Sequence, residues 1–430
     1  MLFNEDFLHH IWKFKLYDFR DLQTTDGEAL EVISAGVHNH HAGPDFQDVR
    51  IRIGDTLWAG HAEIHINAGD WHKHNHTHND AYSNVVLHVV YHNNEPVLLP
   101  DGNAIPTLEL FDRIPESLYL RYHQLVYGNQ KIIPCEGSIK TVNGITIRNW
   151  LTRVLVERLQ KKSEVVINSL QHNRGNWEET FYQFLAANFG FKINALPFEL
   201  LAKSLPQTIL AKHKNSAFQI EALIFGQAGF LEGSLTDAYP VELRGEYHFL
   251  QKKYGLVPVE KHLWKFMRLR PSNFPTVRLA QFAALSFQSN HLFSKILETD
   301  SVVQLRKLFS NIVVNEYWRD HYRFDVGSKP FIKNFGDISI DLLLLNTVAL
   351  FLYSYGSYLK IPAYVDRCLE LLENLPVENN FIINEFKELG VKADSAFESQ
   401  ALLELRSSYC DHKKCLQCGV GNQILNLSNI

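Results

Sequence analysis

Two acidic residues and a pair of histidines near the start of the chain have the types and spacing to bind a metal ion. The two motifs read GPDF at residues 43–46 and GHAEIHI at residues 60–66. Alternate residues of a β-strand share one face, so His61, Glu63 and His65 point to the same side. If the two segments pair as antiparallel strands, Asp45 lies opposite the end of the second strand. His61, Glu63 and His65 therefore form a row of metal-binding or proton-handling groups, and we predict that Asp45 and Glu63 can reach one divalent ion.

Histidines are concentrated around these motifs. Of the 21 histidines, 13 lie in the first 110 residues, and imidazole is the commonest transition-metal ligand. The segment DWHKHNHTHND at 70–80, with the histidine of the next strand, supplies four further candidate ligands for a divalent metal: His74, His76, Asp80 and His88. The alternative is a solvated loop with histidines on its surface, which is the interpretation we favour for His72 and His78.

A second group of histidines precedes Asp45. His38, His40 and His41 belong to a loop that runs beside this carboxylate, and loops next to catalytic residues often contact substrate. We predict substrate contact for these three histidines. The alternative is a polar turn without a function.

Three cysteines near the end of the chain have the spacing of a metal-binding knuckle. Cys410, Cys415 and Cys418 are three of only five cysteines in the chain, a pattern typical of a reducing compartment and not of a disulfide framework. Thiolates at this spacing bind zinc or an iron–sulfur cluster. The fourth ligand has three candidates, which are Cys135, His412 and Cys368. The alternative is that the thiols only pack a terminal turn.

Three arginines surround the start of a predicted helix at Pro275. Pro275 and the preceding Asn273 are typical of a helix N-terminus. Arg268, Arg270 and Arg278 can bind phosphate near such a positive helix end. The commoner role of arginines in this position is to bridge helices.

The pattern of apolar residues predicts an α+β protein. An amphipathic helix at 4–17 is followed by three strands at 29–34, 45–53 and 56–67, an irregular crossover, and a strand at 85–91. Helical periods dominate later, at 150–170, 177–189, 197–202, 217–226, 276–287 and 301–308. We predict a small N-terminal α/β domain with a mixed sheet at 1–115, a linker at 116–145, a mainly helical domain at 146–405 and a cysteine knuckle at 406–425.

Composition and charge limit the choice of partners. The 430 residues are 46% hydrophobic and 21% charged, which is typical of globular proteins. Residues 1–110 carry a net charge of -10 and the remainder +5, so the later part is better suited to contact nucleic acid. The N-terminus lacks the features of a secretory signal, and the most apolar windows are shorter than a membrane span. We expect a cytoplasmic location, no membrane partner and no particular oligomeric state.

The element order and motifs resemble the PD-(D/E)xK nuclease superfamily, whose core is a helix, three strands, a helix and a strand. Pro44-Asp45 and Glu63-Ile64-His65 match its motif positions, except that His65 stands where lysine is usual. The resemblance implies a metal-dependent nuclease in which Asp45 and Glu63 hold Mg²⁺ or Mn²⁺. It also implies that His65 positions or deprotonates water, with the alternative that His65 is a ligand for a softer metal. Some nucleases of that superfamily close an iron–sulfur cluster with one remote cysteine and three near the C-terminus, which implies Cys135 as the fourth ligand.

Over nearly its whole length the chain also resembles a widespread bacterial family of unknown function. This resemblance rests on the motifs above together with Asp70-Trp71, the LHVV run at 87–90 and the Arg-Pro-x-Asn-Phe-Pro run at 270–275. It implies a single-chain cytoplasmic protein and brings no activity. Three functions stay open: a metal-dependent nuclease or related phosphodiesterase, a non-catalytic nucleic-acid-binding or scaffolding protein with an eroded nuclease fold, and a metal-dependent hydrolase of small molecules. The acidic first domain favours the second and third.

Overall fold

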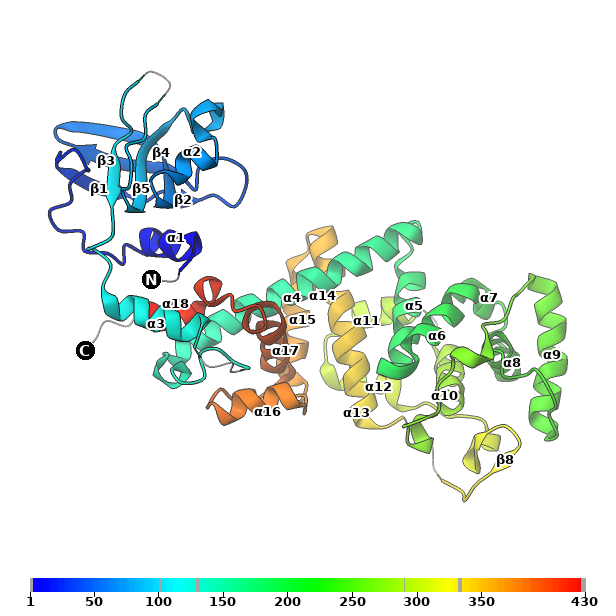
Figure 1. Cartoon of the computed structure of the whole chain (residues 1–430). Coiled ribbons are helices and arrows are strands. Elements are labelled where there is room, and N and C mark those ends of the chain that lie inside the picture. Colours follow the sequence, from blue (N-terminus) through cyan, green and yellow to red (C-terminus); the bar gives the residue numbers. More distant parts are fainter. Residues whose placement is uncertain (1–2, 100–101, 129–131, 290, 332–334, 427–430) are drawn as a thin grey trace. The chain divides into compact units, whose positions relative to one another are not determined.

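The computed structural model of the chain describes residues 3–99, 102–128, 132–289, 291–331 and 335–426 (Figure 1). The chain divides into two compact units. A sheet unit comprises Met1–Thr152, Glu388–Gly390 and Leu403–Ile430, and a helical unit comprises Arg153–Lys387 and Val391–Leu402. The architecture is α+β, as the sequence predicts. The whole predicted linker and the whole cysteine knuckle belong to the sheet unit, where α3 (Glu116–Val126) and the last helix pack together.

The sheet unit is built on a six-stranded mixed sheet. Its strands are β1 (Leu30–Ser34), β2 (Val37–His38), β3 (Phe46–Ile53), β4 (Thr56–Asn67), β5 (Val85–His92) and β6 (Thr107–Glu109). Their order is β1-β3-β4-β5-β6, with β2 paired to β3 at the edge. Pairing is antiparallel from β1 to β4 and parallel from β4 to β6. The predicted three strands, crossover and fourth strand are therefore present, and β2 and β6 are additional.

Two features of these strands position the residues of the candidate site. All of β5 except its last residue is buried, which is typical of a central strand covered on both faces. In β3 the register with β4 shifts between Phe46 and Val49, and Asp48 within the shift has a left-handed φ of 56°. Such a β-bulge bends the strand, and Asp45, which precedes β3, lies beside Glu63 and Ile64 of β4.

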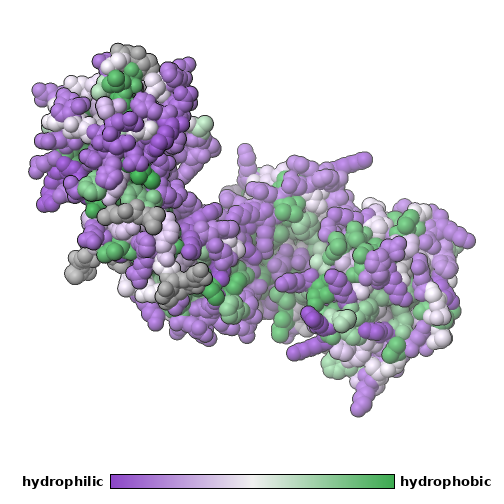
Figure 2. Space-filling model, viewed as in Figure 1, coloured by the Kyte–Doolittle hydropathy of each residue, from purple (hydrophilic) through white to green (hydrophobic). Residues whose placement is uncertain are grey.

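Helix α1 (Glu5–Phe14) packs against β4 through its apolar side. Phe7, Leu8, Ile11 and Trp12 are buried completely, as the helical spacing predicts. The crossover between β4 and β5 consists of α2 (Asp70–Lys73) and two short 3₁₀ turns at His76–His78 and Asp80–Tyr82. The face of the sheet unit visible in Figure 2 is largely hydrophilic.

The remaining elements are helices and one small hairpin. The helices are α4 (Gly144–His172), α5 (Trp177–Phe189), α6 (Phe191–Ser204), α7 (Gln207–Ala211), α8 (Ala217–Gln227), α9 (Ala238–Tyr254), α10 (Pro275–Gln288), α11 (Leu292–Glu298), α12 (Val302–Ser310), α13 (Asp337–Leu343), α14 (Ala349–Leu359), α15 (Pro362–Asn374), α16 (Phe381–Glu388), α17 (Ala396–Glu404) and α18 (Gly419–Asn426). The hairpin pairs β7 (His321–Arg323) with β8 (Val326–Gly327). Five of the six predicted helical periods fall within α4, α5, α6, α8 and α10, and the sixth, at 301–308, begins one residue before α12.

One helical stretch, Asp337–Leu359, is long and apolar enough to cross a membrane by length and composition. About two thirds of its most apolar window, 67%, is buried inside the protein. A core helix of a globular unit has the same properties, so this stretch is weak evidence for a membrane span.

Candidate metal centre

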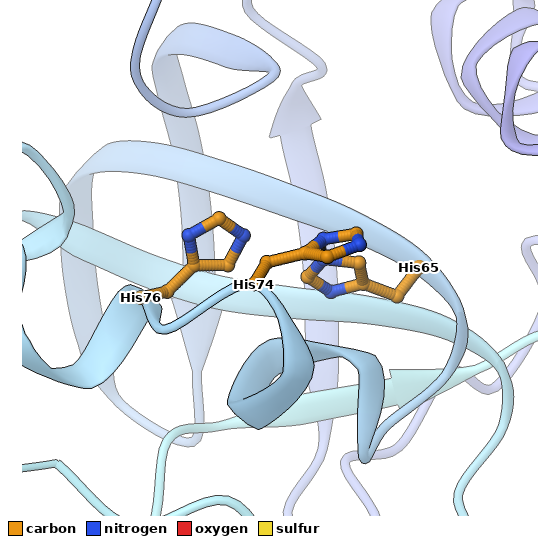
Figure 3. Close-up of side chains that lie close together, drawn as sticks. All are labelled: His65, His74 and His76. Carbon is orange, nitrogen blue, oxygen red and sulfur yellow. Dashed lines mark hydrogen bonds between the residues drawn. The ribbon is translucent and has the colours of Figure 1, made fainter.

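Three histidines from β4 and the crossover meet at one point. One ring nitrogen from each of His65, His74 and His76 lies within 4.8 Å of the other two, and His65 Nε2 is 3.1 Å from His74 Nδ1. Figure 3 shows the three imidazole rings gathered together, with His65 on the strand and the other two on the crossover. His65 and His76 are buried and His74 is exposed, so the cluster opens to solvent on one side.

The Glu63 carboxylate supplies a fourth donor to this cluster. Its Oε1 lies 3.1 Å from His76 Nε2 and 3.7 Å from His65 Nε2. His76 Nε2 is buried and has no aligned hydrogen-bond partner, which is costly for a polar atom. A cation bound by His65, His74, His76 and Glu63 would satisfy this nitrogen. Three imidazoles and one carboxylate form a donor set suited to Zn²⁺, Mn²⁺ or Fe²⁺.

Asp45 lies beside the cluster and connects the two motif strands. Its backbone N–H donates to Glu63 Oε2 at 3.0 Å, and its own Oδ2 accepts from the Ile64 N–H at 3.0 Å. The β-bulge in β3 makes these reciprocal bonds possible. They hold the Glu63 carboxylate in place, so the structure brings the predicted Asp45 and Glu63 together.

Helix α1 contributes two side chains that the sequence analysis did not identify. His9 Nε2 lies 3.2 Å from Asp45 Oδ2, and Glu5 interacts electrostatically with His74, Asp45 and His9. Glu5 and His9 are one helical turn apart and therefore share a face of α1. That spacing was the signal available in the sequence, but it does not reveal which element the face packs against.

Burial controls the protonation of the site. Burial, together with the neighbouring imidazoles of His76 and His74, lowers the pKa of His65 to about 3. Burial raises the pKa of Glu63 above its usual value. Burial also acts to raise the pKa of Asp45, but His9, the Ile64 N–H and His65 together outweigh it and bring this pKa below its usual value. A neutral imidazole is the form that binds a metal, so His65 is ready to act as a ligand at neutral pH.

His88 lies behind His65, on the neighbouring strand β5. Its Nε2 is 2.8 Å from His65 Nδ1, and burial lowers the pKa of His88 to about 3. When His65 donates its Nδ1–H to His88, the lone pair of His65 Nε2 faces Glu63 and His74. A hydrogen bond to the far ring nitrogen is the usual way in which proteins orient a metal-binding histidine. His88 is therefore a positioning residue for His65.

Other predicted residues of the sheet unit lie farther from the cluster. Asp80 is exposed, and within the described residues its carboxylate makes no contact with the three histidines. His38 stacks on Phe46 with ring centroids 4.8 Å apart and meets the edge of His9 at 5.2 Å. His40 and His41 are exposed. His38 thus lies beside His9 and also interacts electrostatically with Asp45.

The predicted arginines belong to the helical unit. Arg278 is buried and donates to Asn273, Gln281 and Ser339. Its guanidinium lies over the rings of Phe191 and Phe335, at 4.7 and 5.1 Å. It therefore connects helices, which is the alternative role, and does not face solvent. Arg268 and Arg270 are exposed.

Four of the five cysteines lie in the sheet unit and near one another. Cys135, Cys410, Cys415 and Cys418 interact electrostatically in every pairing. The other two candidates for a fourth ligand are placed differently: Cys368 is buried in α15 of the helical unit, and His412 is exposed.

The chain belongs to a family described as a protein of unknown function, DUF2851, whose model matches residues 5–381. The match covers the whole sheet and most of the helical unit. No curated protein and no solved structure matches the chain significantly.

Proposed function

We propose that the sheet unit is a metal-dependent phosphodiesterase that cleaves nucleic acid. The observation that carries the proposal is the cluster of His65, His74, His76 and Glu63, with donor atoms 3.1 to 3.7 Å apart in the pairs given above. These residues would hold one divalent cation. Such a cation, when bound, polarises a phosphoryl group and lowers the pKa of water.

The neighbouring residues have separate roles in this proposal. Glu63 is held by the Asp45 backbone, and His65 is oriented by His88, so neither donor needs to rearrange when substrate binds. Asp45 contacts the buried Nε2 of His9 and orients its ring, so a proton for the leaving oxygen would come from the other ring nitrogen, Nδ1. The exposed side of the cluster, at His74, is where substrate would enter.

Three observations support phosphodiester cleavage as the reaction. The order of α1, three antiparallel strands, a crossover and a parallel strand resembles the core of the PD-(D/E)xK nucleases, and Asp45 and Glu63 stand at the motif positions. A bound cation offsets part of the -10 charge of residues 1–110, which otherwise repels a polyanion. The remaining residues carry +5 and favour contact with a nucleic-acid backbone.

A second candidate is a metal-dependent hydrolase of small molecules. The negative charge of the first 110 residues favours it, because a small neutral or cationic substrate is not repelled. The two functions predict the same metal and different substrates, so one set of assays separates them.

The test begins with metal content. The full chain is stripped with a chelator, dialysed against Zn²⁺, Mn²⁺ or Mg²⁺, and analysed for bound metal at neutral pH. We expect about one Zn²⁺ or Mn²⁺ per chain in the sheet unit, and loss of this metal in Glu63→Gln and His76→Ala. The matched control is His78→Ala, an exposed histidine two residues farther along the same crossover, which should keep the metal.

Activity is then measured on single-stranded DNA, double-stranded DNA, RNA and bis(p-nitrophenyl) phosphate. We expect metal-dependent cleavage of a nucleic acid that falls about a hundredfold or more in Glu63→Gln and not in His78→Ala. Cleavage of small esters alone would favour the second candidate. A metal-loaded protein without any hydrolysis would refute both, and wild-type protein that binds no metal would refute the centre itself.

A further inference from the structure

A chain of hydrogen bonds in the helical unit ends on a partly exposed tyrosine. The Tyr254 hydroxyl lies 2.8 Å from His213 Nε2, and His213 Nδ1 lies 2.7 Å from Gln219 Oε1. The Gln219 side-chain amide in turn donates to Glu246 Oε1 at 2.8 Å. A nucleophile, a base within hydrogen-bonding distance and a third group that orients the base are the parts of a nucleophilic catalytic site.

Three consecutive elements bring these residues together. His213 lies in the turn between α7 and α8, Gln219 lies in the first turn of α8, and Glu246 and Tyr254 belong to α9. Helices α8 and α9 pack against each other (Figure 1). Glu246 and Tyr254 are eight residues apart, so they lie on the same side of α9. The packing of two helices therefore holds all four side chains in place.

The Gln219 side chain is available for this chain because its usual partner is already bonded. Ser216 caps α8, and its Oγ accepts from the Gln219 N–H at 3.3 Å. In a capping box, the side chain of a glutamine at this position bonds back to the N–H of the capping residue. Here the Ser216 N–H donates instead to the His213 carbonyl oxygen, at 3.1 Å. The Gln219 amide therefore turns toward His213 and Glu246.

The direction of each hydrogen bond follows from Glu246. A carboxylate only accepts hydrogen bonds, so the NH₂ group of Gln219 faces Glu246 and its carbonyl oxygen faces His213. His213 Nδ1 must then carry the proton. In the neutral imidazole the lone pair is left on Nε2, where it accepts the hydrogen bond from the Tyr254 hydroxyl. A histidine that only filled the core would be satisfied in either tautomer, whereas this chain selects the one in which His213 is a base toward Tyr254.

Two lysines beside Tyr254 favour an anionic substrate. Lys212 Nζ and Lys253 Nζ lie 5.5 and 5.2 Å from the centroid of the Tyr254 ring. Both lysines are exposed and Tyr254 is partly exposed, so an anion can approach the phenol from solvent. Ammonium groups attract anions, and lysine is a common ligand for phosphate. The charge beside the phenol is therefore suited to a phosphoryl group.

We propose that Tyr254 is the nucleophile of a phosphoryl-transfer site whose donor is an acyl phosphate or a phosphoanhydride. The Tyr254 oxygen attacks phosphorus and forms an O–P bond, while the bond from phosphorus to the leaving oxygen breaks and its electron pair stays on that oxygen. The phenolic proton moves to His213 Nε2 and then to solvent. Gln219 and Glu246 are positioning residues for His213. The proposal does not depend on the function proposed for the histidine centre, which belongs to the sheet unit.

The experiment incubates the full chain with acetyl phosphate, or with ATP and Mg²⁺, and maps phosphorylated residues by mass spectrometry of its peptides. We expect phosphotyrosine at Tyr254, with release of acetate or ADP, and none at this position in Tyr254→Phe. The rate at Tyr254 should fall about a hundredfold or more in His213→Gln. The matched control is His248→Gln, an exposed histidine of α9, which should react as wild type. Wild-type protein that stays unmodified at Tyr254 with both donors, phosphate on His213 instead, or an equal rate in His213→Gln would overturn the proposal.

Glu246→Gln tests the orientation of His213, and it replaces the first test if His213→Gln fails to fold. A glutamine at 246 can accept or donate, so it no longer fixes the Gln219 amide, and His213 should populate both tautomers. Nitrogen NMR of histidine-labelled protein should show protonated Nδ1 in the wild type and a mixture in Glu246→Gln, with transfer to Tyr254 slowed by on the order of tenfold or more. The matched control is Glu242→Gln, at an exposed position of α9, which should keep the wild-type spectrum and rate. A wild-type His213 protonated at Nε2 alone, or an unchanged rate in Glu246→Gln, would overturn the proposal.

Discussion

Replacing Glu221 by glutamine should stabilise the helical unit at alkaline pH and remove a dependence of its stability on pH. Glu221 belongs to α8 and is only 5% exposed. Asn315 Nδ2 donates to its Oε2 at 3.5 Å, and Tyr239 interacts with Glu221 electrostatically. Burial outweighs the bond from Asn315 and raises the pKa of Glu221 from 4.5 to about 7. The folded protein therefore holds a proton that the unfolded chain releases at lower pH.

The sign and size of the effect follow from this difference in pKa. Below pH 4.5 both the folded and the unfolded state bind the proton, and Glu221 does not lower the free energy of unfolding. Between pH 4.5 and about 7 the unfolded chain loses the proton first, so the free energy of unfolding falls as pH rises. Above this range both states are ionised, and the reduction in the free energy of unfolding stays constant. The difference between the folded and the unfolded pKa of Glu221 corresponds to about 3 kcal/mol of unfolding free energy, at about 1.36 kcal/mol per pKa unit. Glu221→Gln keeps the shape and hydrogen-bonding groups of the side chain and has no proton to release.

The assay is urea unfolding of the full chain at pH 5 and pH 8, followed by far-ultraviolet circular dichroism. Wild-type protein should lose on the order of 2 to 3 kcal/mol between these pH values in the transition that reports the helical unit, and Glu221→Gln should lose much less. The control is Glu242→Gln, the same substitution at an exposed position of α9, which should behave as wild type. Parallel curves for wild type and Glu221→Gln would refute the argument, because Glu221 would then ionise in the folded state without a penalty.

Two further predictions concern packing and acid stability. Gly226→Ala should destabilise the helical unit by several kcal/mol, since the new Cβ would lie 2.0 Å from the ring of Tyr247. Gly245→Ala, with open space around its Cβ, should instead stabilise α9 by about 0.5 to 1 kcal/mol. Equal urea unfolding midpoints for the two variants would contradict this difference. Burial lowers the pKa values of His65 and His88 to about 3, so the unfolded chain binds protons at these histidines at higher pH than the folded chain. The free energy of unfolding of the chelator-treated sheet unit should therefore be highest above about pH 6.5 and fall by on the order of 2 kcal/mol per histidine by pH 5. Urea midpoints of wild type and His88→Gln at pH 7 and pH 5 would check this, and a flat wild-type profile would disprove it.

The sheet could be predicted closely from the sequence because its strands obey a local rule. Alternation of apolar and polar residues marked 45–53 and 56–67, and the structure has β3 at Phe46–Ile53 and β4 at Thr56–Asn67. The bulge at Asp48 could not be predicted, because it depends on how β3 registers against β4 and not on the pattern within β3. The two-residue β2 is too short to have a pattern of its own.

The candidate metal centre was only partly predictable for the same reason. Glu63 and His65 share a face of one strand, so their proximity follows from the alternation of side chains. Proximity to His76 depends on the path of the crossover. Proximity to His9 depends on how α1 docks, and no local pattern describes either arrangement. Arg278 illustrates the opposite case, since its charge and position suggested phosphate binding whereas tertiary packing placed it between two aromatic rings.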